Sequence, residues 1–326
     1  MTILRYIVAC LVTALTTVFA ISPAMSQVDY PTKPIRMVVG LSAGGAVDIT
    51  ARRLANNLAE QFRVPLVVDN KPGANGVVAH DLVARSEPDG YTVVFNSGSL
   101  VQGYAISKKI TYDPIKDFAP VILFSRTPLT IVVNASNPVK SIGDFIAHAR
   151  MNPGKLSYGT AGTGNITHLA GVLFLQNVGI SAVHIPYKGS APALLDLMGG
   201  RIDFSTASVT SISAHVRENR LRALALMSDK RSVALPGLVT FKEAGISNME
   251  VYSWVGIMGP AKMPPQRVQR LNAAVRSALK DPQLISAITQ DGSEPLGSSP
   301  TEYAEFMLRE LRRWTKIIET NHLSAE

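Results

Sequence analysis

The sequence predicts an α/β protein built as two lobes, and three observations support this prediction. The chain has 326 residues, more than one hydrophobic core usually fills, and 46% of them are hydrophobic, enough for two modest cores. Runs rich in β-branched residues alternate with helical runs, as in the βαβ units of a parallel sheet. A proline-flanked segment at residues 118–138 then begins a second series of the same kind.

The first series contains three predicted strands and two predicted helices. The strands are "PIRMVVG", "VPLVVDN" and "YTVVFNSGS", and the helices cover residues 47–62 and 74–85. In the first helix Leu54 and Leu58 fall on one face, and Arg53 and Glu60 fall on the other. We therefore expect this helix to pack one side on the sheet and to turn the other side to water.

The second series predicts a second lobe that interrupts the first. It runs from the strand "LTIVVN" and the helix "SIGDFIAHARM" to the strand "LRALALMS", and helical material then follows "VYSWVGIMGPAKMPP" up to a last helix at 301–319. We expect the chain to cross between lobes near residues 125–131 and 250–257. Lobe 1 would then hold residues 27–128 and 253–326, and lobe 2 residues 129–252. Ligands of such α/β proteins bind outside the carboxyl ends of the strands.

The N-terminus has the pattern of a secretory signal peptide covering residues 1–26. Arg5 precedes an apolar run from Ile7 to Ile21, and the small residues Ala24 and Ser26 stand before Gln27. A membrane anchor is the alternative, but the run is short for a span and threonines interrupt it. We expect cleavage and a periplasmic protein. The lipobox-like residues before Cys10 lie too near the start for lipidation, and the cleaved chain would have no cysteine and so no disulfide.

The distribution of charge argues against a nucleic-acid partner. The formal net charge of +8 is spread along the chain, no basic run is longer than two residues, and aromatic residues make up only 6%. A mildly positive surface instead favours the collection of anionic solutes. We expect a monomer.

Four loops at predicted strand ends carry the candidate ligand-binding residues. Small residues before a helix present backbone N–H groups, and the helix N-terminus adds partial positive charge, so such loops suit an anion. The candidates are Ser42, Ala43, Gly44, Gly45, Ala46 and Asp48 in the first loop, Ser97 and Gly98 in the second, Thr160, Ala161, Gly162, Thr163 and Gly164 in the third, and Lys188 in the fourth, with Asp203 in addition. The alternatives are that the glycines only permit tight turns, the serines only cap helices and the lysine is only solvated.

Metal-binding, thiol-redox and nucleotide-binding motifs are absent from the sequence. There is no H-E-x-x-H, C-x-x-C or G-x-x-x-x-G-K-[ST] pattern. Asp48, Asp203 and His168 could form a triad with Ser97, but no fixed spacing supports it. The sequence therefore predicts a binding protein that is not an enzyme and that needs no metal or cofactor.

Several long motifs, in order, resemble one known family. They are "YPTKPIRMVVGLSAGGAVDITARRLA", "VVDNKPGANGVVAHDLVARSEPDGYTVVF", "LSYGTAGTGNITHLAG", "HIPYKGSAPALLDLMGGRIDF" and "LRALAL". They resemble the extracytoplasmic solute receptors of the tripartite tricarboxylate transporter family, called Bug receptors. The resemblance implies a two-lobed, type II-like periplasmic-binding-protein fold with a cleft between Rossmann-like lobes. It also implies a small carboxylate ligand, delivered to a membrane transporter with two integral subunits.

The resemblance further implies that the ligand carboxylate lies between two facing loops. These roles fall on Ser42–Ala46 with Asp48, and on Thr160–Gly164. The sequence departs from the family pattern where "GLSAGG" replaces a proline-rich "P-F-P-P-G-G", and where Ala207 stands at a position that is commonly Asp. Two alternatives remain open, a secreted bilobal hydrolase-like enzyme that uses Ser97 or Ser99, and a sensor subunit that presents its ligand to a membrane histidine kinase.

Overall fold

The computed structural model describes residues 30–44, 46–107 and 109–324. The expected signal peptide, Cys10 and Gly45 lie outside the described residues. The chain divides into two units, residues 1–32 and residues 33–326, and every helix and strand described belongs to the second. No helix within the described ranges is long and apolar enough to cross a membrane.

The first part of the sheet is mostly parallel. Its strands are β1 (Ile35–Val39), β2 (Leu66–Asn70) and β3 (Thr92–Ser97), and β1 pairs in parallel with both of the others. The helices that follow these strands are α2 (Ala46–Phe62), α3 (Val77–Ala84), preceded by the 3-10 turn Ala74–Gly76, and α4 (Ser99–Ile106). In α2 Leu54 and Leu58 are buried and Arg53 is exposed, so the predicted amphipathic face is confirmed.

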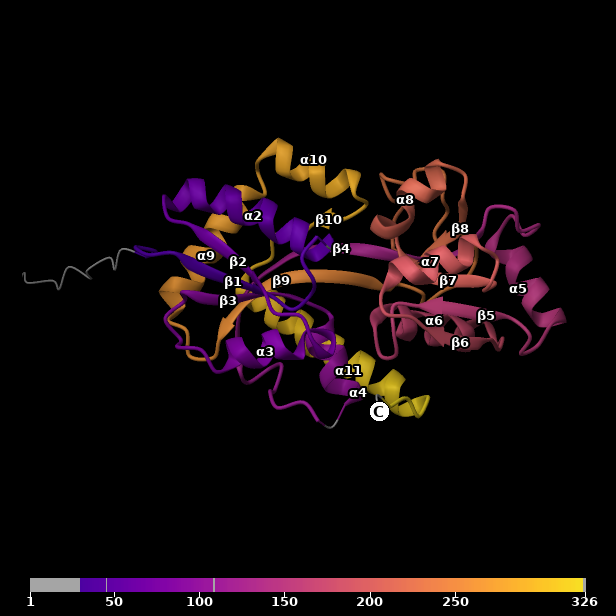
Figure 1. Ribbon diagram of the computed structural model, residues 1–326, viewed down its shortest axis with the longest axis horizontal. Coiled ribbons are helices and arrows are strands. Elements are labelled where there is room, and N and C mark those ends of the chain that lie inside the picture. The colour runs from indigo at the N-terminus through magenta and orange to yellow at the C-terminus, as the bar shows by residue number, and fades with distance from the viewer. Residues whose placement is uncertain (1–29, 45, 108, 325–326) are drawn as a thin grey trace, which may run out of the picture. The chain divides into compact units, whose positions relative to one another are not determined.

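Two long strands connect this part of the sheet to the next. Strand β9 (Tyr252–Pro260) lies between β3 and β4 (Phe118–Asn134) and is antiparallel to both. Strand β4 pairs with β9 from Phe118 to Pro128, and from Leu129 onward with β7 and β8. The change of partner lies within the segment where the sequence places the first crossing, and both strands run along the middle of Figure 1.

The second part of the sheet repeats the βα pattern. Its elements are α5 (Ile142–Met151), β5 (Ser157–Thr160), α6 (Ile166–Val178), β6 (Val183–Pro186), α7 (Ser190–Met198), β7 (Phe204–Ser208), α8 (Val209–Arg217) and β8 (Leu221–Leu226). Strand β5 pairs in parallel with β6 and β7. The carboxyl ends of β5, β6 and β7 therefore lie at one edge and lead into α6, α7 and α8.

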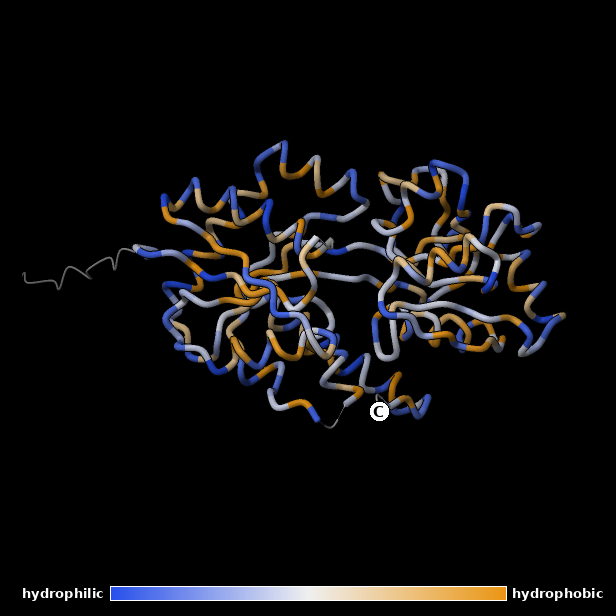
Figure 2. Tube along the Cα trace, in the orientation of Figure 1, coloured by the Kyte–Doolittle hydropathy of each residue, from blue (hydrophilic) through white to orange (hydrophobic). Residues whose placement is uncertain are grey.

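The chain then returns to the first part. This last section comprises β9, α9 (Pro265–Ala278), α10 (Pro282–Gln290), the short β10 (Glu294–Pro295) and α11 (Pro300–Thr320). Ser299 and Glu302 form a capping box that fixes the start of α11. In Figure 2 hydrophobic and hydrophilic stretches alternate along the helices.

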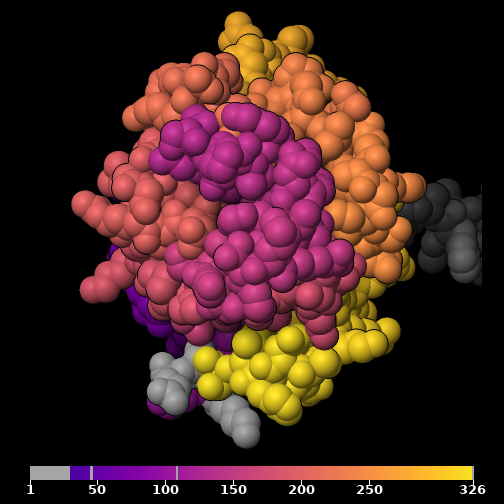
Figure 3. All heavy atoms as spheres, turned by 90° about the vertical axis from the view of Figure 1, so that its right-hand side faces the viewer, coloured from indigo at the N-terminus to yellow at the C-terminus, as the bar shows by residue number. Residues whose placement is uncertain are grey.

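Helix α11 contributes to two separate hydrophobic cores. Tyr303 and Met307 belong to the core around β3, α3 and α4. Trp314 and Ile318 belong to the core that contains Phe174 of α6. Figure 3 shows this C-terminal helix in yellow directly against the magenta elements of the second part. The helix therefore ties the two cores together.

Candidate ligand-binding site

A cavity of about 150 Å³ lies where the loops after β1, β3 and β5 approach β4, β9 and the starts of α7 and α8. We call it the Thr167 cavity. It is lined from the first part of the sheet by Leu41, Val47, Asn75, Ser97, Gly98, Ser99 and Gln102. It is lined from β4, β9 and the second part by Leu129, Ser253, Ala161, Asn165, Ile166, Thr167, Ser190 and Ser208. Both halves of the sheet thus contribute to one cavity.

The walls of the Thr167 cavity are polar but uncharged. No charged side chain lines it among the described residues, and nine of the fifteen lining residues carry a hydroxyl or amide group. The residues at the starts of four helices reach it, namely Ser99 of α4, Ile166 of α6, Ser190 of α7 and the N-cap Ser208 of α8. Because helix N-termini carry partial positive charge and free N–H groups, this arrangement suits an anion.

Gln102 is the most informative side chain in the cavity wall. It is only 2% exposed and lines the cavity, yet its amide makes no hydrogen bond to the protein within the described residues. An amide at a cavity wall pairs with the protein, with water or with a ligand. A Cβ on Gly98 would lie only 2.6 Å from Gln102 Nε2, so the glycine makes room for this amide. The Gln102 NH₂ group is therefore available to a bound acceptor.

Ser97 and Gly98, the candidates from the second loop, both line the cavity. The Ser97 and Ser99 hydroxyls are hydrogen-bonded to each other at 2.9 Å. Ser97, His168, Asp48 and Asp203 do not form a triad, because each has other partners. His168 Nδ1 accepts from the N–H of Gly164, Asp48 contacts the first loop, and Asp203 contacts Ser157. The described residues also contain no cluster of three metal-ligating side chains.

The first loop reaches the cavity at its two ends. Leu41 and Val47 line it, whereas Ser42, Ala43 and Gly44 are exposed and do not. Ala46 begins α2, and Gly45 is outside the described residues. Of the predicted first loop, only the flanking residues Leu41 and Val47 therefore line the cavity among the described residues.

Asp48 holds the first loop from within. It is 2% exposed, and its carboxylate accepts hydrogen bonds from Gly44 N (2.8 Å), Arg52 Nε (3.0 Å) and Asn70 Nδ2 (2.9 Å). Burial acts to raise the pKa of Asp48, but the hydrogen bonds from Arg52, Gly44 and Asn70 outweigh it and hold the pKa below its usual value. Asp48 does not line the cavity and instead positions the turn.

The third loop uses most of its polar groups internally. Ala161 lines the cavity, but its N–H donates to Thr167 Oγ1 at 2.9 Å, and the N–H of Gly162 donates to Thr160 Oγ1 at 3.3 Å. Thr160 Oγ1 lies 2.7 Å from His184 Nε2, and Thr163 is exposed. The structure therefore brings Ala161 to the cavity, while Thr160, Gly162, Thr163 and Gly164 build the loop behind it.

Two histidines support this loop. The rings of His168 and His184 stack with centroids 4.0 Å apart. Burial lowers the pKa of both, and that of His184 falls to about 4. Both rings are therefore neutral near pH 7, and a neutral His168 ring can accept from Gly164 as observed.

The structure places Lys188 and Asp203 away from the cavity walls. Lys188 is exposed, whereas Ser190, two residues later, lines the cavity. Asp203 accepts from the N–H and the hydroxyl of Ser157 at 2.7 and 2.9 Å. Ser157 begins β5, so Asp203 lies at the opposite end of that strand from Thr160 and Ala161.

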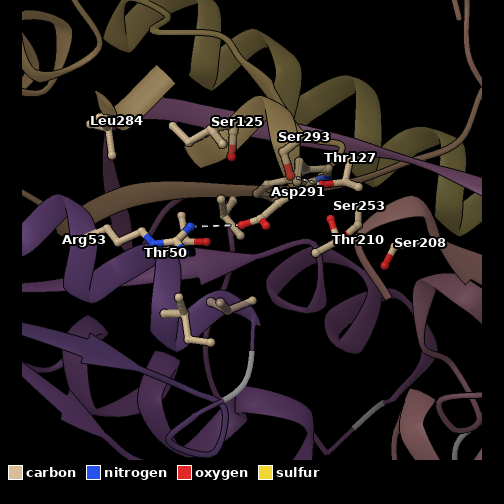
Figure 4. Close-up of a pocket in the computed structure, with 15 residues that line it drawn as sticks. Thr50, Arg53, Ser125, Thr127, Ser208, Thr210, Ser253, Leu284, Asp291 and Ser293 are labelled. Carbon is tan, nitrogen blue, oxygen red and sulfur yellow. Dashed lines mark hydrogen bonds and ion pairs between the residues drawn. The ribbon is translucent and has the colours of Figure 1, made fainter. Parts of the chain in front are cut away.

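A second cavity, of about 300 Å³, shares Val47, Ser208 and Ser253 with the first. We call it the Arg53 cavity. Arg53 of α2 pairs with Asp291, which follows α10, at 3.0 Å (Figure 4). Its further polar lining comes from Thr50, Ser125, Thr127, Thr210 and Ser293 and its apolar lining from Ile49, Trp254, Val255, Leu284 and Ile288. This cavity thus combines one internally neutralised ion pair with apolar surface.

Sequence reasoning missed several lining residues of both cavities. Asn165, Ser190 and Ser208 follow strands and cap or begin helices, which is the signal that identified the other loops. Gln102 lies inside a helix and Ser253 lies within a strand, so no local sequence pattern distinguishes them.

Residues 50–323 match the family model described as the tripartite tricarboxylate transporter family receptor. A protein of a Pseudomonas species, described as a UPF0065 protein in the tcbD-tcbE intergenic region, is 37% identical over 297 residues. The match covers 91% of this chain and 88% of that protein.

Two solved structures are similar over nearly the whole chain. One, of an R. palustris protein with adipate, is 33% identical with a TM-score of 0.83 and covers 90% of this chain and 99% of that chain. The other, of the periplasmic binding protein BugD, is 30% identical with a TM-score of 0.80 and covers 91% of this chain and 100% of that chain.

Proposed function

Because the chain belongs to the tripartite tricarboxylate transporter receptor family, we propose that it binds a small carboxylate in the Thr167 cavity and presents it to a membrane transporter of this type. The family match confirms the resemblance seen in the sequence motifs. The α/β fold class of a periplasmic binding protein is confirmed as well. The carboxylate ligand, its site and the transporter as partner of this chain are our proposal.

The observation that carries the proposal is the unpaired amide of Gln102 in an uncharged cavity. A buried carboxylate needs hydrogen-bond donors, and each bond to a charged group contributes about 1.5–3 kcal/mol. Gln102 and the starts of α4, α6, α7 and α8 supply donors from both halves of the sheet. The adipate bound by the R. palustris relative supports the same ligand class.

We propose that the ligand carboxylate lies between the β3–α4 segment and the β5–α6 loop. Ser97, Gly98 and Gln102 face it from the first side, and Ala161 and Thr167 from the second. Asp48 fixes the first loop, and the two stacked histidines fix the third, so both act as positioning residues. We propose that the first loop, Ser42–Ala46, and Lys188 contact the ligand only after the lobes close on it, because Ser42, Ala43, Gly44 and Lys188 do not line the cavity.

We propose that residues 27–128 with 253–326 form one lobe and residues 129–252 the other, and that the lobes close on the ligand. The change of partner along β4 at Pro128 and Leu129 supports this division. The end of α11 packs in the core of the second lobe, so it bridges the division.

The family and the similar structures support a periplasmic receptor without catalytic activity. BugD is a periplasmic binding protein, and Ser97 is paired with Ser99 rather than with a histidine. We propose that residues 1–26 direct export and are removed, and that the receptor acts as a monomer. N-terminal sequencing of periplasmic material tests the cleavage before Gln27.

Calorimetry of Gln102 variants tests the binding proposal. Protein purified from the periplasm is titrated with mono- to tricarboxylates, and neutral sugars and nucleotides serve as controls. Gln102→Glu should abolish carboxylate binding by charge repulsion, and Gln102→Met should weaken it about tenfold or more through the lost donor. Gln266→Glu, at an exposed position of α9, is the control for the added charge and should bind normally.

Three results would overturn the proposal. The wild-type protein could bind sugars or nucleotides and no carboxylate. Gln102→Glu could stay folded and bind carboxylates with unchanged affinity, which would place the ligand elsewhere. A loss of binding in Gln266→Glu as great as in Gln102→Glu would show a general charge effect instead of a local contact.

A further inference from the structure

The Arg53 cavity adjoins the proposed carboxylate site and continues it. Val47, Ser208 and Ser253 belong to the walls of both cavities. The Arg53 cavity is the larger, about 300 Å³ against about 150 Å³. A ligand anchored by its carboxylate in the Thr167 cavity can thus extend past Ser208 and Ser253 into the Arg53 cavity.

The charges in the Arg53 cavity cancel each other. Arg53 and Asp291 are the charged side chains among its described lining residues, and they pair at 3.0 Å. Both are about half exposed, with side-chain exposures of 43% and 46%. A second carboxylate at this end of the ligand would meet Asp291 as well as Arg53, and no unpaired cation lines the described wall.

Thr210 supplies an unmatched hydrogen-bonding group in the same wall. Its Oγ1 is buried and has no hydrogen-bond partner within the described residues. Thr210 comes from α8, whereas Arg53 comes from α2, so the two halves of the sheet face each other here (Figure 4). A hydroxyl both donates and accepts, so once the Thr210 side chain turns its hydroxyl toward the cavity an uncharged polar group of the ligand can pair with it.

We propose that the Arg53 cavity is a subsite for the far end of an elongated monocarboxylate, and that it selects an uncharged polar group such as a hydroxyl over a second carboxylate. Leu284 and Ile288 of α10 add apolar surface to the same cavity. Thr210 binds the terminal hydroxyl, and Asp291 disfavours a terminal carboxylate. This inference rests on the proposed carboxylate site.

Calorimetry with three matched series of probes tests the subsite. The probes are linear alkanoates, ω-hydroxyalkanoates and α,ω-dicarboxylates of four, six and eight carbons. At the length that spans both cavities, we expect the hydroxy acid to bind about tenfold more tightly than the alkanoate and the dicarboxylate. Thr210→Val should remove the advantage over the alkanoate, and Thr210→Ser should keep it. The exposed Thr301→Val of α11 is the matched control.

Asp291→Asn tests the discrimination against a second carboxylate independently, because this variant leaves Arg53 without its carboxylate partner. In this variant the dicarboxylate should gain at least about tenfold relative to the hydroxy acid. Glu305→Gln removes one negative charge from an exposed pair in α11 and should leave the ratio unchanged. Thermal unfolding establishes that each variant is folded.

The outcomes separate this inference from the proposed function. If no carboxylate binds to the wild-type protein, the proposed function fails. If alkanoates bind but the dicarboxylate is the tightest probe at every length, the inference is overturned while the carboxylate site stands. The inference is also overturned if the hydroxy acid binds no more tightly than the alkanoate of equal length. It is overturned as well if Thr210→Val stays folded and still binds the hydroxy acid as much more tightly than the alkanoate as wild type does.

Discussion

The indole Nε1 of Trp254 donates a hydrogen bond to the buried carboxylate of Glu310 at 3.0 Å. The indole of Trp314 donates to the same oxygen, also at 3.0 Å. Trp254 lies on β9 in the first core, and Trp314 lies in the second core, so Glu310 links the two through α11.

Replacing Glu310 should destabilise the whole protein. Glu310→Leu leaves two buried indole N–H groups without an acceptor, and we expect a loss of about 2–4 kcal/mol in the free energy of unfolding. Glu310→Gln keeps a side-chain carbonyl oxygen and should lose less. Urea unfolding followed by tryptophan fluorescence measures both. Equal stability of Glu310→Leu and wild type would contradict this role.

The histidine pair predicts a fall in stability at acid pH. The folded-state pKa of His184 is about 4, below the ordinary 6.5, so the unfolded chain binds the proton more tightly. The stability gained from the neutral ring is complete above pH 6.5 and is lost as the pH falls towards 4. Allowing for partial solvent exposure, we expect His184 to contribute about 1 kcal/mol.

Urea unfolding between pH 7 and pH 4 measures this loss in wild type and in His184→Gln. The glutamine does not titrate, so the dependence of stability on pH should become shallower. His148→Gln, an exposed substitution on α5, is the control. If the free energy of unfolding depends equally on pH in wild type and in His184→Gln, this histidine is not a source of the acid sensitivity. His80, whose pKa burial lowers to about 3, should account for part of the remaining slope.

Asp48→Asn should weaken both the fold and ligand binding. The variant loses charge-assisted hydrogen bonds from Arg52 and Gly44, with an expected cost of about 1–3 kcal/mol at pH 7. Because the folded-state pKa of Asp48 is lowered, its contribution is present above pH 3.8 and is lost as the pH falls through the folded value. Denaturation and calorimetry measure the two effects. Glu218→Gln, in an exposed ion pair, should change stability by less than about 0.5 kcal/mol.

Gly98→Ala should reduce ligand affinity without unfolding the protein. The backbone at Gly98 has φ −52° and accepts alanine, but the new Cβ would lie 2.6 Å from Gln102 Nε2 and push that amide aside. We expect affinity for the carboxylate to fall about tenfold, through loss of one good hydrogen bond. Gly237→Ala, where a Cβ meets nothing within 4 Å, is the control. Unchanged affinity in a folded Gly98→Ala protein would argue against the placement of Gln102.

Local pattern predicted much of the fold. The apolar spacing of Leu54 and Leu58 gave the correct buried face of α2, and small residues after strands led to Ser97, Gly98 and Ala161 in the cavity wall. These features depend on the period of a helix and on the ends of parallel strands, which neighbouring residues encode.

Long-range contacts could not be predicted in the same way. Gln102 and Ser253 reach the cavity because α4 and β9 are placed by partners far away in the sequence. Asp203 seemed available as a binding residue, yet pairing of β5 with β7 directs it to Ser157. The sequence pattern of α11 predicts one amphipathic helix, and nothing in that pattern indicates that its two halves pack in different cores.

The place of β9 between β3 and β4 sets an order of events during synthesis. Strands β4 to β8 follow one another in the sequence, so β4 can pair with β7 and β8, and β5 with β6 and β7, once residue 226 has emerged. The earlier strands β1 to β3 can pair with one another, but β3 presents an open edge until residues 252–260 have emerged. A nascent chain therefore cannot cover this edge of β3 until most of the chain has been made.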